Sequence, residues 1–346
     1  MRQLRYPIRS RQTQQRSTIA FSPAKLVHFV HSIALKKVRA WSLPFAFSVG
    51  FLGFSALAVS AGNEWVIQRL AADVDDTSVF AESRQRAPGG LPDGLITAYE
   101  GRTDILKAWY TEPTTRYGHG ILGDRIEAGT LNVRLPNGND LSLKLSDTEV
   151  FEDRYPRLAD LDGDGSTEVI TIRSSLSAGA SVTVYGLRDG ALIEKATTGF
   201  IGRSNRWLNI AGIARFFGRK TMEIAFVRTP HIGGTLFIHR FENGRLRQVA
   251  SLDGFSNHQI GSREMRLSAI ADVNGNGRME LALPSDSRAV LRIVGISEGN
   301  LIELGSVDLA ARIDKAIGVK GTGNSTRFIV GLDNSEVYEI SQKGPE

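Results

Sequence analysis

The sequence predicts an all-β fold made of repeated units, and three observations support this. From residue 91 onward, short runs of Val, Ile, Leu, Phe and Thr are separated by Gly, Asn and Asp turns, with no sustained helical period. Tight hairpin turns recur at spacings of 54 and 55 residues and end at Gly190, Gly244 and Gly299. A glutamate that opens an apolar run recurs at spacings of 55 and 57 residues, at Glu168, Glu223 and Glu280. Such a period is typical of a propeller blade or a comparable β array.

Each unit is expected to contain four short antiparallel strands. In the second unit these strands cover residues 157–159, 168–173, 181–187 and 192–197. The units fall near residues 95–150, 151–203, 204–258, 259–311 and 312–341. The last unit has only three strands, so we expect an N-terminal strand within 62–90, with residues 78–80 as the candidate, to complete it and remove an exposed edge. A five-bladed propeller follows, with a partial larger propeller or an open solenoid as alternatives.

Composition and charge exclude several classes of protein. The 346-residue chain has no Cys, which excludes a disulfide scaffold, thiolate metal sites and cysteine catalysis. The formal net charge is +5, but residues 1–61 hold nine Lys or Arg and no Asp or Glu. The remainder carries 33 basic and 37 acidic residues, so we expect no nucleic-acid partner.

The N-terminal region, residues 1–61, is predicted to be a basic region plus a signal peptide or membrane anchor. Lys36, Lys37 and Arg39 precede an apolar run over 41–61 that ends in Val-Ser-Ala, as at a signal-peptidase site. Cleavage places the protein in the periplasm or outside the cell. An uncleaved helix, allowing membrane association through 41–61, anchors it to the inner membrane. Residues 62–90 are expected to be a linker that supplies the closing strand, and residues 91–346 form the repeat domain.

An acidic loop in the second unit has the composition of a calcium site. Carboxylates stand at its first, third, fifth and ninth positions, with glycines between them that allow a tight curl. Oxygen ligands at this density suit Ca²⁺, and the position-seven carbonyl adds another. The expected ligands are Asp160, Asp162, Asp164, Ser166 and Glu168. The alternative is a solvated acidic turn, although four close anions repel one another without a cation.

A second loop repeats this spacing in the fourth unit with fewer charges. Its expected ligands are Asp272, Asn274, Asn276, Arg278 through its carbonyl, and Glu280. Fewer carboxylates predict weaker binding. The equivalent loop of the third unit, residues 215–223, has Phe217, Arg219 and other residues that do not ligate calcium, so no metal is expected there.

The phrases ADLDGDGSTEVI and ADVNGNGRMEL resemble the FG-GAP or VCBS repeats of integrin-α-like β-propellers. Together with VYGLRDGAL, TPHIGGTL and GFSNHQIGSRE, they make residues 91–341 resemble exported bacterial FG-GAP repeat proteins. The resemblance implies calcium in the loop between the first and second strands of a blade. Such propellers serve adhesion, ligand binding and sometimes catalysis, so the resemblance points to a fold more than to a function.

The expected strand order sorts the loops onto two rims. Calcium loops share one rim, and the loops that carry His119, His231 and His258 share the opposite rim. Further candidates for ligand contact on that second rim are Arg116, Arg206, Trp207 and Arg263. This mixture suggests an anion or sugar-acid pocket. The alternatives are histidines bonded to loop backbones with arginines paired to carboxylates, or a three-histidine metal site.

We therefore expect an exported, calcium-binding β-propeller that binds an unknown protein, a glycan or a small anionic ligand through the rim opposite the calcium loops. The sequence lacks HExxH, GxSxG and phosphate-loop motifs, which favours binding over catalysis. The alternative is a hydrolase or lyase acting on a carbohydrate or phosphoester at the same rim. A close His–carboxylate pair or three-His cluster in one deep pocket would favour that alternative.

Overall fold

The computed structural model describes residues 64–71, 75–99 and 103–343. By its internal contacts the chain divides into two units, Met1–Leu57 and Ala58–Glu346, and every described residue belongs to the second. The expected signal peptide or anchor at 41–61 lies outside the described residues. Within the described part, the structure contains no helix with the length and hydrophobicity needed to cross a membrane.

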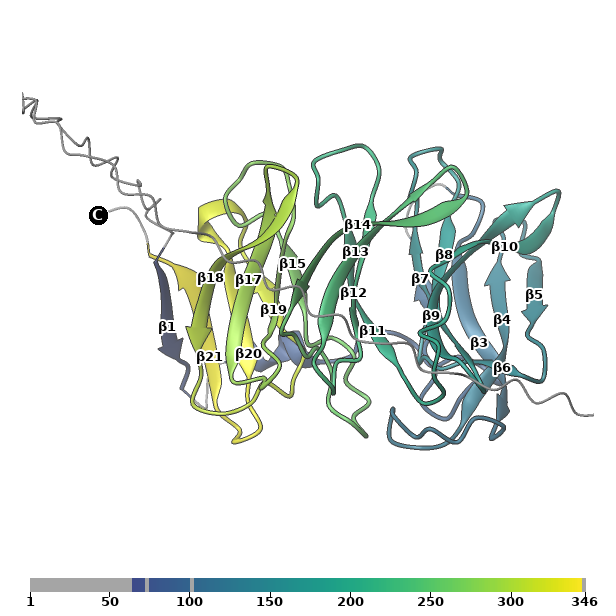
Figure 1. The fold of residues 1–346 in the computed structure, drawn as a ribbon, viewed down its shortest axis with the longest axis horizontal. Coiled ribbons are helices and arrows are strands. Elements are labelled where there is room, and N and C mark those ends of the chain that lie inside the picture. The colour runs from purple at the N-terminus through teal and green to yellow at the C-terminus, as the bar shows by residue number, and fades with distance from the viewer. Residues whose placement is uncertain (1–63, 72–74, 100–102, 344–346) are drawn as a thin grey trace, which may run out of the picture. The chain divides into compact units, whose positions relative to one another are not determined.

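The described residues form an all-β fold, as the sequence predicts. The only helical segments among them are two short 3-10 helices, η1 (Asp75–Phe80) and η2 (Gly323–Ser325). All pairings between the named strands are antiparallel. Twenty of the 21 named strands group into five sets of four. The sets lie side by side (Figure 1).

Each set follows the chain from its first to its last strand. The first set is β2 (Thr97–Ala98), β3 (Lys107–Thr114), β4 (Glu127–Arg134) and β5 (Asp140–Lys144). The second is β7 (Arg157–Ala159), β8 (Glu168–Ser175), β9 (Gly179–Arg188) and β10 (Ala191–Thr197). The third is β11 (Leu208–Ala214), β12 (Glu223–Arg228), β13 (Thr235–Glu242) and β14 (Arg245–Asp253). The fourth is β15 (Ala269–Ala271), β16 (Glu280–Pro284), β17 (Val290–Ser297) and β18 (Asn300–Asp308).

The fifth set takes its fourth strand from the other end of the repeat region. It consists of β19 (Gly318–Lys320), β20 (Arg327–Gly331), β21 (Val337–Gln342) and β1 (Trp65–Arg69). Residues 78–80, the expected candidate, instead lie in η1. Trp65 suits the strand position because its ring packs near Phe328, with centroids 6.0 Å apart, and against the bare Cα of Gly305.

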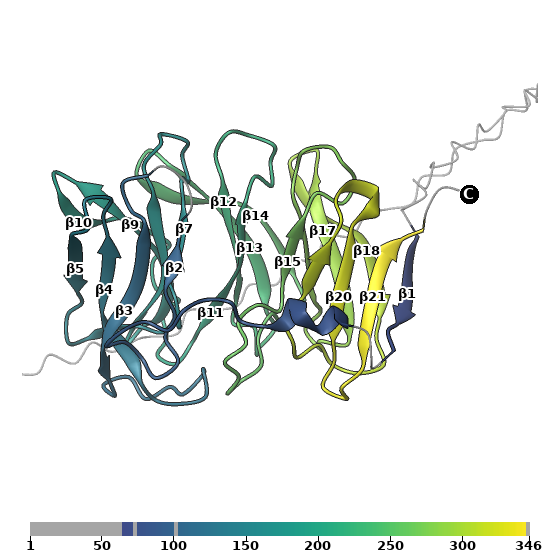
Figure 2. The same cartoon turned by 180° about the vertical axis from the view of Figure 1, so that it is seen from behind.

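One extra strand joins the first two sets. β6 (Glu149–Phe151) pairs with both β4 and β8, so these sets form one nine-stranded sheet. The other sets pack side by side in chain order through contacts between their last strands, β10, β14, β18 and β1. Figure 2 shows the chain from η1 to β2 running from the fifth set to the first.

Apolar side chains fill the space between consecutive sets. Four buried clusters lie in order between the first and second, second and third, third and fourth, and fourth and fifth sets. Central strands are therefore buried on both faces, as in β12 and β16, and their sequences contain short continuous apolar runs instead of alternating ones. Each fully buried aliphatic or Phe side chain contributes about 1.5–3 kcal/mol.

The antiparallel register places two groups of loops at opposite ends of the sets. In the second set, Ala159 pairs with Glu168 at one end, and Ser175 pairs with Gly179 at the other. We call the first end the aspartate rim, which carries loops 160–167, 215–222 and 272–279. We call the other end the histidine rim, which carries loops 115–126, 176–178, 229–234 and 285–289 and the chain crossings 152–156, 198–207 and 254–268.

Candidate functional site

The loop of the second set curls around the carboxylate of Asp160. Its Oδ1 accepts the Gly163 N–H at 2.7 Å and its Oδ2 accepts the Gly165 N–H at 3.0 Å. Both glycines have positive φ, +77° and +89°, which lets the backbone close this turn. Asp164 accepts the Ser166 N–H at 2.7 Å, and this bond holds the pKa of Asp164 below its ordinary value.

Three of the expected calcium ligands come together in this loop. Asp160, Asp162 and Glu168 each place one carboxylate oxygen within 4.8 Å of the other two, whereas Asp164 is outside this group. Glu168 is fully buried, and burial raises its pKa although Lys195 Nζ donates to its Oε1 at 2.6 Å. A divalent ion bound by Glu168 would therefore share this carboxylate with the lysine.

The loop of the fourth set has the same backbone pattern with fewer charges. Asp272 accepts the Asn276 N–H at 3.1 Å and the Gly277 N–H at 2.8 Å. The Arg278 N–H bonds Asn276 Oδ1 at 2.8 Å, and Asn274 Nδ2 donates to Glu280 Oε1 at 3.3 Å. The polar side chains of this loop thus form hydrogen bonds within the loop itself. Among the described residues, no three carboxylates or imidazoles gather here at metal distance.

The recurring glutamate ties the base of each loop. Glu168 accepts the Leu161 N–H at 2.9 Å, Glu280 accepts the Val273 N–H at 2.9 Å, and Glu223 accepts the Phe216 N–H at 3.1 Å. The third loop, which lacks metal ligands, keeps this tie through the buried ion pair of Glu223 with Arg240, at 2.8 Å. The tie therefore does not depend on a metal.

On the histidine rim, His119 forms a close pair with a buried carboxylate. Its Nδ1 lies 2.6 Å from Glu152 Oε1, and Ser174 Oγ donates to the other carboxylate oxygen. Glu152 is fully buried, which raises its pKa. The Glu152 carbonyl accepts the Trp207 indole N–H at 3.1 Å, which links this pair to the next crossing.

Trp207 also packs against the other two expected histidines. The His231 ring stacks on it with centroids 6.2 Å apart and an angle of 4°, and the His258 ring meets it edge-on at 4.7 Å. His231 Nε2 lies 3.0 Å from His258 Nδ1, and His258 Nε2 lies 3.0 Å from the Ser262 carbonyl. The three predicted histidines therefore lie on one rim, opposite Asp162. The described residues of this rim hold no three-histidine set at metal distance.

The three arginines expected to contact a ligand have different surroundings in the structure. Arg116 donates to the Glu149 carbonyl from its Nε at 2.9 Å. Arg263 joins Asp93 at 3.1 Å and Asp124 at 3.0 Å, which ties the crossing before the fourth set to the first set. Arg206 is half-buried, and its carbonyl accepts the Ala180 N–H. The lining of the pocket described next includes none of these three arginines.

A rim pocket of about 430 Å³ opens beside the histidine pair. Its lining residues are Pro230, His231, Ser256, His258, Gln259, Ile260, Asp286, Ser287, Arg288 and Arg312. Arg288 Nη1 donates to Gln259 Oε1 at 2.8 Å and to the Ile313 carbonyl at 3.4 Å. In the described part of the chain, no carboxylate lies within ion-pair distance of the Arg288 or Arg312 guanidinium. Burial and the charge of Arg312 lower the pKa of Arg288.

Sequence reasoning missed Arg288 and Arg312, although its own rule could have found them. Residues 285–289 connect the second and third strands of the fourth unit, and such loops were expected on the histidine rim. Arg312 lies in the crossing that follows β18.

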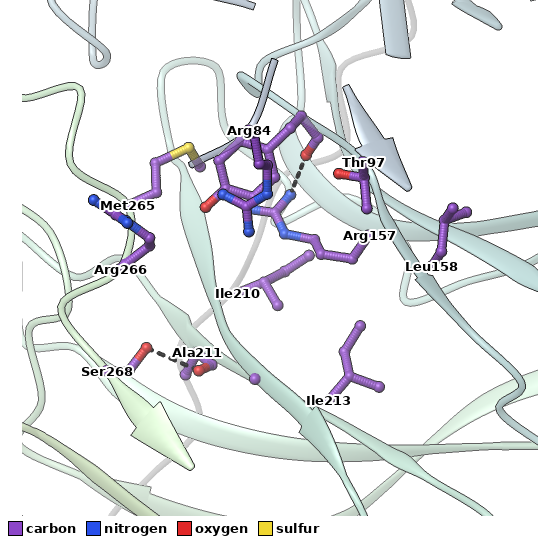
Figure 3. A pocket seen from close by; sticks show the side chains of 12 residues that line it. Arg84, Thr97, Arg157, Leu158, Ile210, Ala211, Ile213, Met265, Arg266 and Ser268 are labelled. Atoms are coloured by element: carbon purple, nitrogen blue, oxygen red, sulfur yellow. Dashed lines mark hydrogen bonds between the residues drawn. The ribbon is translucent and has the colours of Figure 1, made fainter. Parts of the chain in front are cut away.

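A second cavity of about 310 Å³ lies between the first strands of the sets (Figure 3). Arg84 and Arg157 both lie over the Tyr155 ring, at 3.9 and 4.5 Å from its centroid. These arginines are neutralised: Arg84 pairs with Glu82, Arg157 with Asp153, and the third cavity arginine, Arg266, with Glu264. This central cavity therefore offers an anion fewer available charges than the rim pocket.

Comparisons with known proteins leave the family open. No protein-family profile and no curated protein matches the chain. It is similar to the exotype rhamnogalacturonan lyase YesX (15% identity, TM-score 0.39, 72% of this chain and 56% of that chain). It is also similar to the Bacillus licheniformis rhamnogalacturonan lyase PL11 (16% identity, TM-score 0.43, 72% of this chain and 50% of that chain). A further similar structure is BBS1N in complex with ARL6DN (9% identity, TM-score 0.40, 73% of this chain and 66% of that chain). The chain spans about half the length of the two lyases, and at TM-scores below 0.5 these likenesses assign no activity.

The histidine pair predicts a pH dependence of stability. Burial is the main cause that lowers the pKa of His231 to about 4 and of His258 to about 3, from an ordinary value of 6.5. Between pH 6.5 and 4 the unfolded chain binds more protons, so the free energy of unfolding falls as the pH falls. Each imidazole contributes a slope of up to about 1.4 kcal/mol per pH unit. Urea unfolding at several pH values should show a shallower slope for the double variant H231Q/H258Q, and equal slopes would contradict this assignment.

Proposed function

We propose that this protein is an exported β-propeller with five blades that works as a binding module for a small anionic ligand. Five four-strand sets and a last set completed by β1 support a propeller-like array of five blades. The four apolar layers join consecutive sets, no such layer joins the fifth set to the first among the described residues, and these two sets lie at opposite ends of the array in Figure 1, which favours an open, partial propeller over a closed ring. The resemblance of the two Asp-rich loops to FG-GAP repeats supports the propeller-like array as well. The binding surface is the histidine rim, at the pocket beside His231 and His258.

One observation carries the binding assignment: Arg288 and Arg312 line the same pocket, and among the described residues no carboxylate lies within ion-pair distance of either guanidinium group, although Asp314 and Asp333 lie near enough to act on the charge of Arg288. Arg288 is half-buried. Burial is the main cause that lowers its pKa, and repulsion by Arg312 lowers it further, against the opposing charges of Asp333 and Asp314. An anion between the two guanidinium groups would relieve this repulsion. Arginine also offers planar, paired donors that match carboxylates and phosphates.

The loops around the pocket have the rigid geometry of a prebuilt site. Thr229, a β-branched residue, has a φ of +51°, and Arg288 has a φ of +62°. Such conformations cost about 1–3 kcal/mol each and persist where surrounding contacts enforce them. Gly234 supplies one such contact, because a Cβ there would lie 1.9 Å from the Phe255 carbonyl oxygen. Rigid loops reduce the entropy lost when a ligand binds.

The geometry of the histidine rim favours a binding function over the hydrolase or lyase alternative. A close His–carboxylate pair is present, between His119 and Glu152. His119, however, is not among the residues that line the rim pocket, and His258 is fully buried with its Nε2 bonded to a backbone carbonyl. The pair and the pocket thus do not form one deep site of the kind that acid–base catalysis needs.

Removing either rim arginine should weaken anion binding. In R288A and R312A, the affinity for acetate and for inorganic phosphate should fall about 10-fold or more, as expected when a charged hydrogen bond worth about 1.5–3 kcal/mol is lost. The affinities can be measured by NMR titration of the histidine ring signals. The control R247A removes an exposed arginine of β14 and should bind as the original protein does. Equal affinities in all four proteins would exclude this pocket.

We propose in addition that the loop 160–168 binds Ca²⁺ and that the ion acts on stability. The three gathered carboxylates of Asp160, Asp162 and Glu168 fit a hard cation, and the Ser166 carbonyl is the fourth candidate ligand. Asp164 would have to exchange its bond to the Ser166 N–H for a bond to the ion. The loop 272–280 fits less well, because Asn274, Asn276 and Glu280 bond within the loop. The aspartate rim lies opposite the rim pocket, so the ion would not touch the ligand.

Calcium should therefore raise the thermal stability of the protein and leave anion affinity unchanged. Free calcium at a hundred times the Kd adds about 2.7 kcal/mol to the free energy of unfolding. We expect a melting temperature several degrees higher in calcium than in excess chelator, and no such gain for D162A. The control D308A, at an exposed residue of β18, should keep the gain. A melting curve of the original protein that does not respond to the chelator would contradict the calcium site.

A further inference from the structure

The hydrogen bonds of the histidine pair fix which ring nitrogen can accept a bond from a ligand. The Ser262 carbonyl can only accept, so His258 carries its proton on Nε2. His258 Nδ1 must then accept from the His231 Nε2–H. In the neutral pair, His231 Nδ1 is therefore left as an acceptor, and it has no hydrogen-bond partner in the described part of the chain. A ligand beside His231 can be recognised through a group that donates, such as a hydroxyl or an amide N–H.

The pocket also has an apolar side. Ile260, one of its lining residues, is 64% exposed, and Ile232, next to His231, is 60% exposed. These two are the most exposed large apolar side chains among the described residues. Ile260, in a pocket that also holds two arginines, offers an apolar contact to a ligand that has an apolar part close to its anionic group.

The pocket lacks the feature that sugars use most often, a flat aromatic ring open to the ligand. Its lining contains no Phe, Tyr or Trp. Trp207 is only 2% exposed, and the His231 ring is stacked on it. A sugar acid would satisfy the arginines and His231 but would leave Ile260 without an apolar contact.

We infer that the rim pocket binds the C-terminal end of a peptide whose last side chain is apolar. The terminal carboxylate lies between Arg288 and Arg312, the last peptide N–H donates to His231 Nδ1, and the last side chain packs on Ile260. Asp286, which also lines the pocket, disfavours the carboxylate at its own side and so fixes the direction of the peptide. A volume of about 430 Å³ is within the range of ligand pockets and suits an end of a few residues. This inference rests on the proposed anion-binding function.

The test uses three probes and isothermal titration calorimetry on the protein at neutral pH. The probes are N-acetyl-Gly-Gly-Ile with a free carboxylate, the same peptide as its C-terminal amide, and galacturonate. The free acid should bind at least 10-fold more tightly than either other probe. I260S, a change at an exposed residue that should not disturb folding, should weaken binding of the acid several-fold. H231F, which removes the acceptor, should weaken it as well, and R247A should leave it unchanged.

The possible results separate the peptide assignment from the proposed function. Equal binding of acid and amide, galacturonate binding as tightly as the acid, or acid binding that does not change in both I260S and H231F would overturn the peptide assignment. Anion binding through Arg288 and Arg312 would then still stand on the acetate and phosphate titrations. If every probe bound R288A and R312A as tightly as it binds the original protein, both proposals would be overturned.

Discussion

Burial of both faces of the three inner sets is the constraint on which the rest of this structure depends. Strands such as β12 and β16 carry buried apolar side chains on both sides, so a sheet of this kind must be covered twice. The four buried clusters show how the chain solves this, with each set covering the next in chain order. Stacking in order gathers equivalent loops from different sets at common rims. Residues far apart in the sequence, such as Glu152, Trp207 and His258, thereby form one cluster.

The two rims then carry different physical roles. On the aspartate rim, the recurring glutamates hold the loop bases whether or not carboxylates occupy the other ligand positions, as the Glu223–Arg240 pair demonstrates. A metal there would add to a turn that is already formed. On the histidine rim, Arg263 forms ion pairs with Asp93 and Asp124, and these pairs join the crossing 254–268 to the first set. The guanidinium groups of Arg288 and Arg312 have no such ion pair among the described residues, which is the basis of the proposed anion site.

Local patterns predicted the strands well and the side-chain partners poorly. The expected residues of the second unit agree with β7, β8, β9 and β10 to within two residues, because Gly turns and apolar runs mark their ends. The glutamate period also identified equivalent positions in three sets. By contrast, the added strand was expected at 78–80, whereas Trp65–Arg69 occupies it. Both segments pack against glycines, Trp65 against Gly305 and Val79 against Gly318, and strand patterns do not show these contacts. Strand order was enough to place the three histidines on one rim, but the choice between Arg263 and Arg288 depends on which carboxylates lie nearby in space.

Anomalous diffraction from a bromide-soaked crystal would test the central claim most directly, since it locates an anion without assuming any ligand. The account predicts a bromide peak between the guanidinium groups of Arg288 and Arg312, beside His231. Peaks at Arg84 or Arg266 in the central cavity, with none in the rim pocket, would contradict it.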